Sequence, residues 1–275
     1  MRFLNNFKKK IGQQFYLFKK LSQYTSKLGI SFWDFNSLRK VKLSHQEDMT
    51  MKVFGNPVTF SAPFWFLHSL NEIFIDEVYK FAPSQEKLKI IDCGANIGLS
   101  VIYLKRLFPN ATITAIEPDK KVFSQLEKNL ENFKFSNVEL LNVAAWINNE
   151  PISFESDGGL GGKISDNEIN STLVKTIRLK NLLQEKIFFL KMDIEGAEYE
   201  VLKDIKEDLK NVENLFIEFH NDFEEKNTLA EILSWIDEAG FKYYIKEAWN
   251  NMRNPFMKSY QGGYHMQLNI FCYRS

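Results

Sequence analysis

The stretch Ile90-Ile91-Asp92-Cys93-Gly94-Ala95-Asn96-Ile97-Gly98-Leu99-Ser100 decides the fold of this chain. The apolar run at 88–91 predicts a buried strand, and the small residues after it predict a tight turn. Apolar residues then recur at helical spacing as far as Leu107. A strand, a glycine turn and a helix start in this order point backbone N–H groups at whatever lies above the strand, which favours a bound cofactor.

The next predicted strand carries a second acid. Segment 112–116 is followed by Glu117, at a position where a carboxylate can bind ribose hydroxyls. The turn has the spacing Gly94-x-x-x-Gly98 and lacks the G-x-G-x-x-G of dinucleotide sites, which argues against nicotinamide and flavin cofactors. Asp92 would repel a phosphate but suits a cationic ligand with an amino group, such as S-adenosylmethionine. The alternative is a strand-to-helix turn that binds no ligand.

These positions define the predicted cofactor site. We expect the turn and its neighbours to hold the methionine portion of S-adenosylmethionine, Glu117 to bind the ribose, and residues after the third strand to border the adenine. The predicted cofactor-binding residues are Asp92, Gly94, Asn96, Gly98, Ser100, Glu117, Asn142 and Ala144.

Candidate catalytic residues end two further strands. Ligands of doubly wound sheets bind beyond the carboxyl ends of the strands, where Asp193 and Glu195 follow one strand and Glu218 and His220 end the next. Asp193 is the first candidate to position or deprotonate an acceptor. Glu195 is an alternative, although a carboxylate there also suits the cap of the following helix. His220 is either a base with a pKa near neutrality or a structural histidine.

An acid–acid–histidine cluster of this kind also permits a divalent metal. Its oxygen ligands would favour Mg²⁺ or Mn²⁺ over zinc. The sequence contains no dedicated spacing of metal ligands, so we expect no metal.

The chain resembles the FkbM-type methyltransferases from about Asn71 to the C-terminus. The resemblance implies an S-adenosylmethionine-dependent O-methyltransferase that acts on a hydroxyl of a sugar, a glycan or a natural product, as in polysaccharide biosynthesis. Segment 176–180 departs from the acidic sequence that the family often has there, so no role is carried over to it. The matching segments are Asn71-Glu72-Ile73-Phe74, Asp76-Glu77-Val78-Tyr79, Asp92-x-Gly-Ala-Asn-x-Gly98, Glu117-Pro118, Lys191-Met192-Asp193-Ile194-Glu195-Gly196-Ala197-Glu198 and Ile217-Glu218-Phe219-His220.

Alternating strand and helix signals predict an α/β fold. We expect a doubly wound, mainly parallel, seven-stranded sheet of the Rossmann-like class I methyltransferase type, with its last strand antiparallel. A helical extension at 1–50 would precede the methyltransferase domain at 51–275, and a helix at 73–81 would lead into the sheet. The predicted strands are 88–92, 112–117, 138–143, 187–192, 213–219, 241–246 and 267–273, and the predicted helices lie near 98–108, 119–133, 197–207 and 226–240.

Composition favours a cytoplasmic enzyme. The 275 residues include 35 basic and 35 acidic ones, so no overall charge attracts nucleic acid. No apolar run approaches the roughly 20 residues of a membrane span. Residues 1–33 contain no acid and predict a basic amphipathic helix, which either contacts the inner face of an anionic membrane or packs on the domain.

Two other functions remain open from the residues. An N-methyltransferase would use the same cofactor site on a different acceptor atom. A membrane-tethered scaffold that binds the cofactor without catalysis would need no acceptor chemistry at Asp193.

Overall fold

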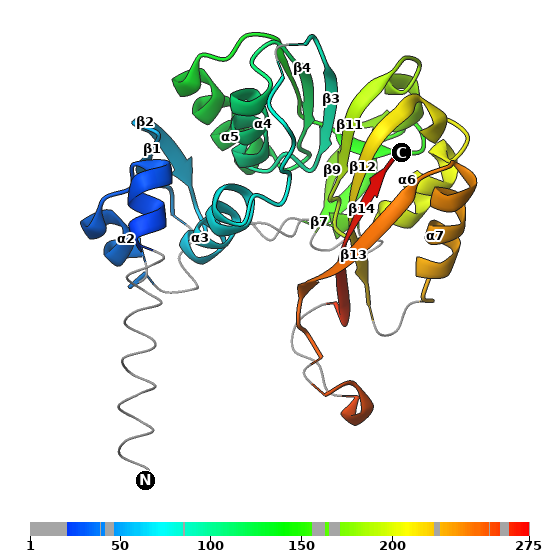
Figure 1. The fold of residues 1–275 in the computed structure, drawn as a ribbon. Helices are drawn as coiled ribbons and strands as arrows, with labels where there is room; N and C mark the ends of the chain where they lie inside the picture. Colours follow the sequence, from blue (N-terminus) through cyan, green and yellow to red (C-terminus); the bar gives the residue numbers. More distant parts are fainter. Residues whose placement is uncertain are drawn as a thin grey trace.

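The centre of the molecule is a seven-stranded sheet in the order β13-β14-β12-β11-β3-β4-β5 (Figure 1). The structure is a computed structural model that describes residues 21–38, 40–41, 47–84, 86–155, 163–164, 171–222, 226–252, 254–258 and 264–274. β14 runs antiparallel to both of its neighbours, β12 and β13, as predicted for the last strand, while all other pairs in this sheet are parallel. The strands are β3 (Lys89–Cys93), β4 (Thr112–Ile116), β5 (Val138–Leu141), β11 (Ile187–Met192), β12 (Val212–Asn221), β13 (Lys242–Trp249) and β14 (Met266–Tyr273).

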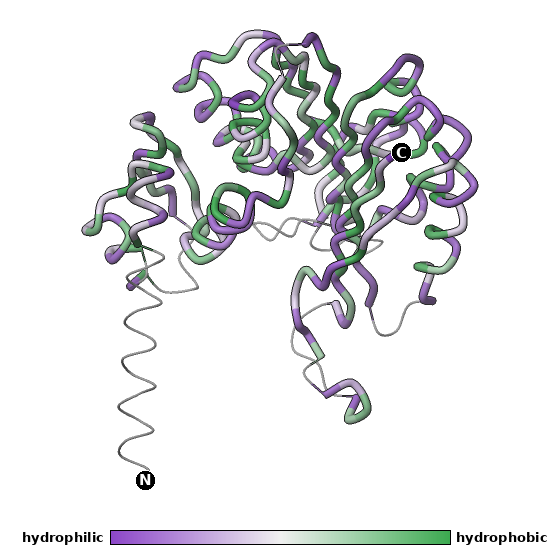
Figure 2. Tube along the Cα trace, viewed as in Figure 1, coloured by the Kyte–Doolittle hydropathy of each residue, from purple (hydrophilic) through white to green (hydrophobic). Residues whose placement is uncertain are grey.

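Helices cover both faces of this sheet, which confirms the doubly wound α/β fold. Successive side chains of a strand point to opposite faces, so Ile90 packs in the core beneath α4 and α5 while Ile91 packs in the core beneath α6 and α7. The hydropathy of the chain follows this arrangement, with apolar residues concentrated along the central strands (Figure 2). The helices are α4 (Leu99–Leu107), α5 (Lys120–Phe133), α6 (Glu198–Ile205) and α7 (Leu229–Glu238).

Residues before the sheet form a small helical and hairpin layer. Tyr24, Leu28 and Phe35 are buried in the same core as α4 and α5. Residues 1–20, which hold most of the predicted basic helix, lie outside the described residues, so membrane contact stays a prediction. In the described part of the chain, no helix has the length and hydropathy of a membrane span. The elements of this layer are η1 (Tyr24–Leu28), α2 (Phe32–Leu38), β1 (Met49–Val53) and β2 (Asn56–Phe60).

The helix predicted at 73–81 is wrong in its position. The helix α3 (Pro63–Leu70) instead begins ten residues earlier and continues as a π-helical turn, η2 (Asn71–Ile75). Pro63 begins the helix because its missing N–H is not needed in a first turn. The chain turns away after η2, where Glu77 has a left-handed φ of 52°.

Shorter elements cover the region after β5. β6 (Ala144–Trp146) pairs in parallel with β10 (Thr176–Arg178), and β7 (Ile152–Glu155) lies between β8 (Lys163–Ile164) and β9 (Thr172–Val174). The 3-10 helices are η3 (Leu179–Leu182), η4 (Leu209–Asn211) and η5 (Pro255–Met257).

The turn after β3 is pressed against the end of β11. Gly94 has a left-handed φ of 80°, and its N–H donates to the Ile116 carbonyl at 3.0 Å. A Cβ atom at Gly94 would lie 1.8 Å from the carbonyl oxygen of Asp193. Only glycine therefore fits at this position without moving one strand away from the other.

Gly94→Ala should lower the stability of the protein far more than Gly55→Ala. Both glycines have φ near 80°, but a Cβ at Gly55 meets nothing within 4 Å. The shared left-handed strain costs about 1–2 kcal/mol, and the clash at Gly94 adds about 1–3 kcal/mol. Urea unfolding of the two variants measures the difference. If both variants lost the same free energy of unfolding, the ends of β3 and β11 would be free to move apart and the close contact would have no effect on stability.

Candidate active site

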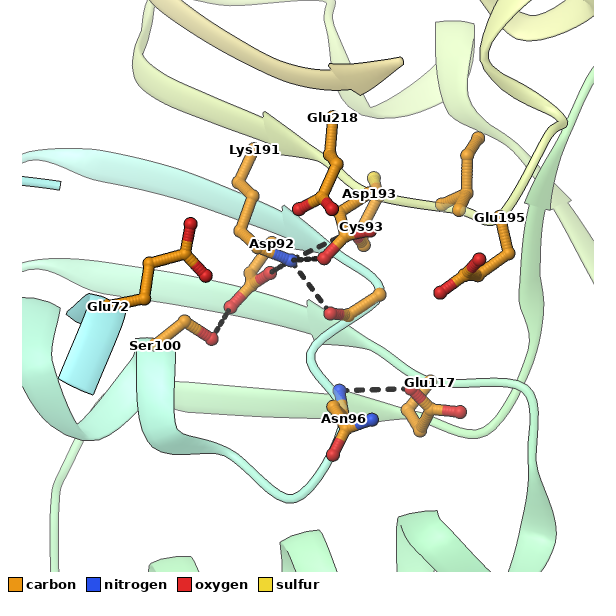
Figure 3. A network of polar contacts seen from close by, with 12 residues as sticks. Glu72, Asp92, Cys93, Asn96, Ser100, Glu117, Lys191, Asp193, Glu195 and Glu218 are labelled. Carbon is orange, nitrogen blue, oxygen red and sulfur yellow. Dashed lines mark hydrogen bonds and ion pairs between the residues drawn. The ribbon is translucent and has the colours of Figure 1, made fainter. Parts of the chain in front are cut away.

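The carboxyl ends of four neighbouring strands gather polar side chains at one edge of the sheet (Figure 3). β3, β4, β11 and β12 run parallel, so their last residues meet there, and the turn after β3 lies among them. The predicted site residues in this group are Asp92, Gly94, Asn96, Gly98, Ser100, Glu117, Asp193, Glu195, Glu218 and His220.

Lys191 lies in the middle of this group. Its Nζ atom donates to the Gly94 carbonyl at 2.8 Å and lies 3.2 Å from Asp92 Oδ1 and 3.4 Å from Asp193 Oδ2. Burial opposes the charge of Lys191, but the carboxylates of Asp92 and Asp193 outweigh it and raise its pKa well above the usual value. The ammonium thus ties the end of β11 to the turn after β3.

Asp92 is completely buried beside this ammonium. Ser100, in the first turn of α4, donates its hydroxyl to Asp92 Oδ2, while Oδ1 faces Lys191. The sequence predicts that Asp92 helps to hold the methionine portion of the cofactor, and this role stays a prediction. In the structure both carboxylate oxygens face protein groups, so Asp92 fixes the shape of the turn.

Glu117 closes the other side of the turn. Its carboxylate accepts hydrogen bonds from the N–H groups of Asn96 and Asp119, both at 2.9 Å. Burial raises the pKa of Glu117 to about 7, against the opposing effect of these two hydrogen bonds. Glu117 therefore changes its charge near neutral pH, beside the turn that the sequence assigns to the cofactor.

Gly98, Asn142 and Ala144 complete the set of predicted cofactor residues. Gly98 has a left-handed φ of 91° and precedes the first residue of α4. The Asn142 amide donates to the carbonyls of Glu117 at 2.9 Å and Pro118 at 3.1 Å, which fixes the segment after β4. Ala144 is buried at the start of β6.

His220 is buried between three carboxylates. Its Nδ1 atom lies 3.2 Å from Glu198, and its Nε2 atom lies 3.6 Å from Glu218 and 3.7 Å from Glu195. Burial opposes a charged ring, but Glu198, Glu218 and Glu195 outweigh it and raise the pKa of His220 well above its usual value. The near-neutral pKa predicted from the sequence therefore does not apply to this arrangement.

Glu198 and Tyr264 hold the segment that leads from β11 into α6. The Glu198 carboxylate accepts from the N–H of Ile194 at 3.1 Å and of Gly196 at 3.0 Å, so it fixes the turn that precedes α6. Tyr264 donates its hydroxyl to the Glu195 carbonyl at 2.9 Å. Glu195 is held here in a left-handed conformation, with φ at 55°.

Glu72 is a member of the group to which the sequence assigns no role. It comes from η2, and its carboxylate accepts a hydrogen bond from Asn269 of β14 at 3.0 Å. Burial and the nearby Glu218 raise the pKa of Glu72 to about 7. An acid within the apolar segment Leu70–Ile75 is the sequence signal that could have identified it.

Acidic groups therefore outnumber basic ones at this edge. Burial raises the pKa of Glu195 to about 8, and the pKa of Glu218 is also raised, by burial and by Asp193. Lys191 is shared between Asp92 and Asp193. Such a group of carboxylates can accept a proton from a hydroxyl or bind a positively charged ligand.

An aromatic group flanks the carboxylates, formed by Phe64, Trp65 and His68 of α3 and Trp249 of β13. The Trp249 ring centroid lies 5.6 Å from that of Trp65 and 5.2 Å from that of His68. Phe64, Trp65 and Trp249 are each more than a third exposed. Trp249 is in register with Gln267, which is in register with His220, so two strand spacings separate the aromatic group from the carboxylates.

Comparison with known protein families places the chain among methyltransferases. The family model "Methyltransferase FkbM domain" matches residues 92–243. "Methyltransferase 1" of Beauveria bassiana is 29% identical over 65% of this chain and 83% of its own length. "Methyltransferase sdnD" of Sordaria araneosa is 28% identical over 62% of this chain and 80% of its own length.

A solved structure with a similar fold is the crystal structure of methyltransferase FkbM from Methylobacillus flagellatus. The TM-score is 0.49 at 17% sequence identity, over 68% of this chain. This chain spans 44% of the length of that protein.

Lys191→Met should destabilise the protein by about 3–5 kcal/mol, because Asp92 would remain buried without a cation. The double variant with Asp92→Asn should recover a large part of this loss. Lys89→Met is the matched control, since Lys89 forms an exposed pair with Glu185 and its loss costs about 1 kcal/mol or less. Urea unfolding measures all three. A loss at Lys191 no larger than at Lys89 would contradict a structural role for the buried pair.

Proposed function

Because this chain belongs to the FkbM family of methyltransferases, we propose that it transfers the methyl group of S-adenosylmethionine to a hydroxyl of a sugar or a sugar-bearing natural product. The chain is an enzyme of the methyltransferase class, and the proposal concerns its cofactor and acceptor. The observation that carries it is the position of partly exposed carboxylates next to the turn between β3 and α4. The partly exposed carboxylates are Asp193, Glu195 and Glu218.

The turn after β3 suits S-adenosylmethionine better than a dinucleotide. Gly94 lets the turn after β3 lie directly against the end of β11, so the backbone of the turn and the side chains of Asp193 and Glu195 lie close together. Glu117 follows β4, where a carboxylate can bind ribose hydroxyls. The carboxylates at this edge of the sheet would make binding of a pyrophosphate unfavourable. S-adenosylmethionine carries no phosphate and supplies, when bound, a methyl group on a sulfonium for in-line displacement by an acceptor oxygen.

We assign the acceptor side of the reaction to the strand ends. Methyl transfer forms a bond from carbon to the acceptor oxygen and breaks the bond from carbon to sulfur, while the hydroxyl proton leaves for a base. Asp193 is the base that we propose, because its side chain is about a quarter exposed and lies directly after β11. Lys191, 3.4 Å away, helps to hold the Asp193 carboxylate in position at the end of β11.

The aromatic group supports a sugar as the acceptor. Apolar faces of sugar rings pack on exposed aromatic rings, while their hydroxyls bind to carboxylates. Trp65, His68 and Glu72 recur three and four residues apart on one continuous helical segment, α3 with η2, so they lie along one side of it. A sugar lying on this side would contact aromatic rings and reach the carboxylates.

The affinity for S-adenosylhomocysteine should rise as the pH passes through about 7, which is the raised pKa of Glu117. The reason is that the ionised carboxylate is the better acceptor of hydrogen bonds from the ribose hydroxyls. Glu117→Gln should remove this rise and weaken binding above that pH by about 1.5–3 kcal/mol. Calorimetric titration at several pH values measures both effects. Binding of NAD but not of S-adenosylhomocysteine would contradict the proposed cofactor.

The same pKa affects stability in the opposite direction. Glu117 has its full stabilising contribution below its ordinary pKa of 4.5, and this contribution is lost as pH rises through about 7. Thermal unfolding of the ligand-free protein and of Glu117→Gln over this range separates the stability effect from the binding effect.

Asp193→Asn should lower turnover by about 10²–10⁴-fold and leave the affinity for S-adenosylhomocysteine unchanged, because the amide cannot accept the hydroxyl proton. Transfer of a labelled methyl group to sugar nucleotides, lipid-linked glycans and glycosylated small molecules measures turnover. Asp204→Asn, at an ion pair with Arg178 away from the site, is the control. Full turnover by Asp193→Asn on an accepted sugar would place the base elsewhere.

A further inference from the structure

Three metal-ligating side chains converge where the ends of β11 and β12 meet. Asp193, Glu195 and His220 each present one ligand atom, and these atoms all lie within 4.8 Å of one another. We propose that Asp193, Glu195 and His220 bind one divalent cation, Mn²⁺ or Mg²⁺, at the acceptor side of the site. The sequence predicts no metal, since its ligands have no recognised spacing, and the fold brings them together.

The orientation of His220 supports this site. Its side chain is only 1% exposed, and Nδ1 is held 3.2 Å from the Glu198 carboxylate. A bound cation would replace the proton on Nε2 and leave the proton on Nδ1 toward Glu198, and Nε2 would then ligate the cation on the side of Glu195 and Glu218. Both carboxylates lie 3.6–3.7 Å from Nε2, beyond hydrogen-bond distance but suitable for atoms that share a cation. A histidine that binds a metal through one ring nitrogen commonly donates the N–H of its other ring nitrogen to a carboxylate, which fixes the orientation of the ring.

The charge and chemistry of the ligands select the cation. The three convergent ligands are two carboxylates and one imidazole, and Glu218 adds a carboxylate oxygen beside them, 3.6 Å from Nε2. Carboxylate oxygens suit Mg²⁺ and Mn²⁺, and the single imidazole suits Mn²⁺ better. Asp193, Glu195 and Glu218 are all partly exposed, so a cation and its water molecules have access from solvent.

A cation here would act on the acceptor, and this consequence rests on the proposed function. An acceptor hydroxyl that replaces one water on the cation would have a lower pKa and would lie beside Asp193. Binding of the cation itself needs neither the methyl donor nor the acceptor. It can therefore be measured without any assumption about the reaction.

The test is a titration of tag-free, chelator-treated protein with Mn²⁺, followed by the electron paramagnetic resonance signal of the free ion. No methyl donor or acceptor is present. We expect one Mn²⁺ per chain, displaced by excess Mg²⁺. Glu195→Gln and His220→Ala should weaken binding by at least about 100-fold, and Glu198→Gln, behind the imidazole, by about 10–100-fold. Glu185→Gln, an exposed acid paired with Lys89, should change nothing.

Two results would overturn the site. One is the absence of bound Mn²⁺ at millimolar concentration, and the other is binding that survives unchanged in Glu195→Gln. Glu195 is partly exposed, so its isosteric variant should remain folded even if His220→Ala does not, and thermal unfolding checks each variant. S-adenosylhomocysteine titrations on the same samples keep the two proposals separate, because Mn²⁺ binding with no S-adenosylhomocysteine binding would reject only the proposed cofactor.

Discussion

The rest of the site depends on the buried ion pair between the ammonium group of Lys191 and the carboxylate of Asp92. The ammonium neutralises Asp92 where no water reaches and binds the Gly94 carbonyl at the same time. A buried carboxylate that loses its cation costs several kcal/mol, so β3 and β11 are confined to the register that pairs Lys191 with Asp92. The course of the turn after β3, and hence the direction of its N–H groups, follows from this one pair.

The charge of Lys191 is largely taken up by Asp92, and the neighbouring glutamates have too few positive charges around them to balance their own. Burial and mutual repulsion raise the pKa values of Glu72, Glu195 and Glu218, which shows how unfavourable their simultaneous ionisation is. Positive charge from a sulfonium, a divalent cation or a transferred proton relieves this repulsion. The same electrostatic condition would therefore favour binding of the proposed cofactor, binding of the proposed cation and removal of a proton from an acceptor.

Local sequence patterns predict the strands, the helices and the edge of the sheet where the site lies. Apolar runs end in acids, as at Glu117 and Asp193, and parallel strands bring such ends together. Contacts between distant segments were not predictable. The Nδ1 atom of His220 faces Glu198 only because α6 returns beside β12, and Glu72 reaches the site only because α3 begins at Pro63. Neither contact leaves a periodic signal in the sequence.

The positions in the chain of the residues that border the site have a consequence for how enzymes of this family can change their acceptors. Trp65, Glu72 and Trp249 all lie outside residues 92–243, the segment that matches the family model, whereas Lys191 and Glu117 lie within it. The aromatic rings proposed to bind the acceptor sugar therefore lie in other parts of the chain than the residues proposed to bind the methyl donor and the proposed base Asp193. New acceptors can be gained by exchanging the flanking segments, without disturbing the buried ion pair that keeps the shared segment in shape.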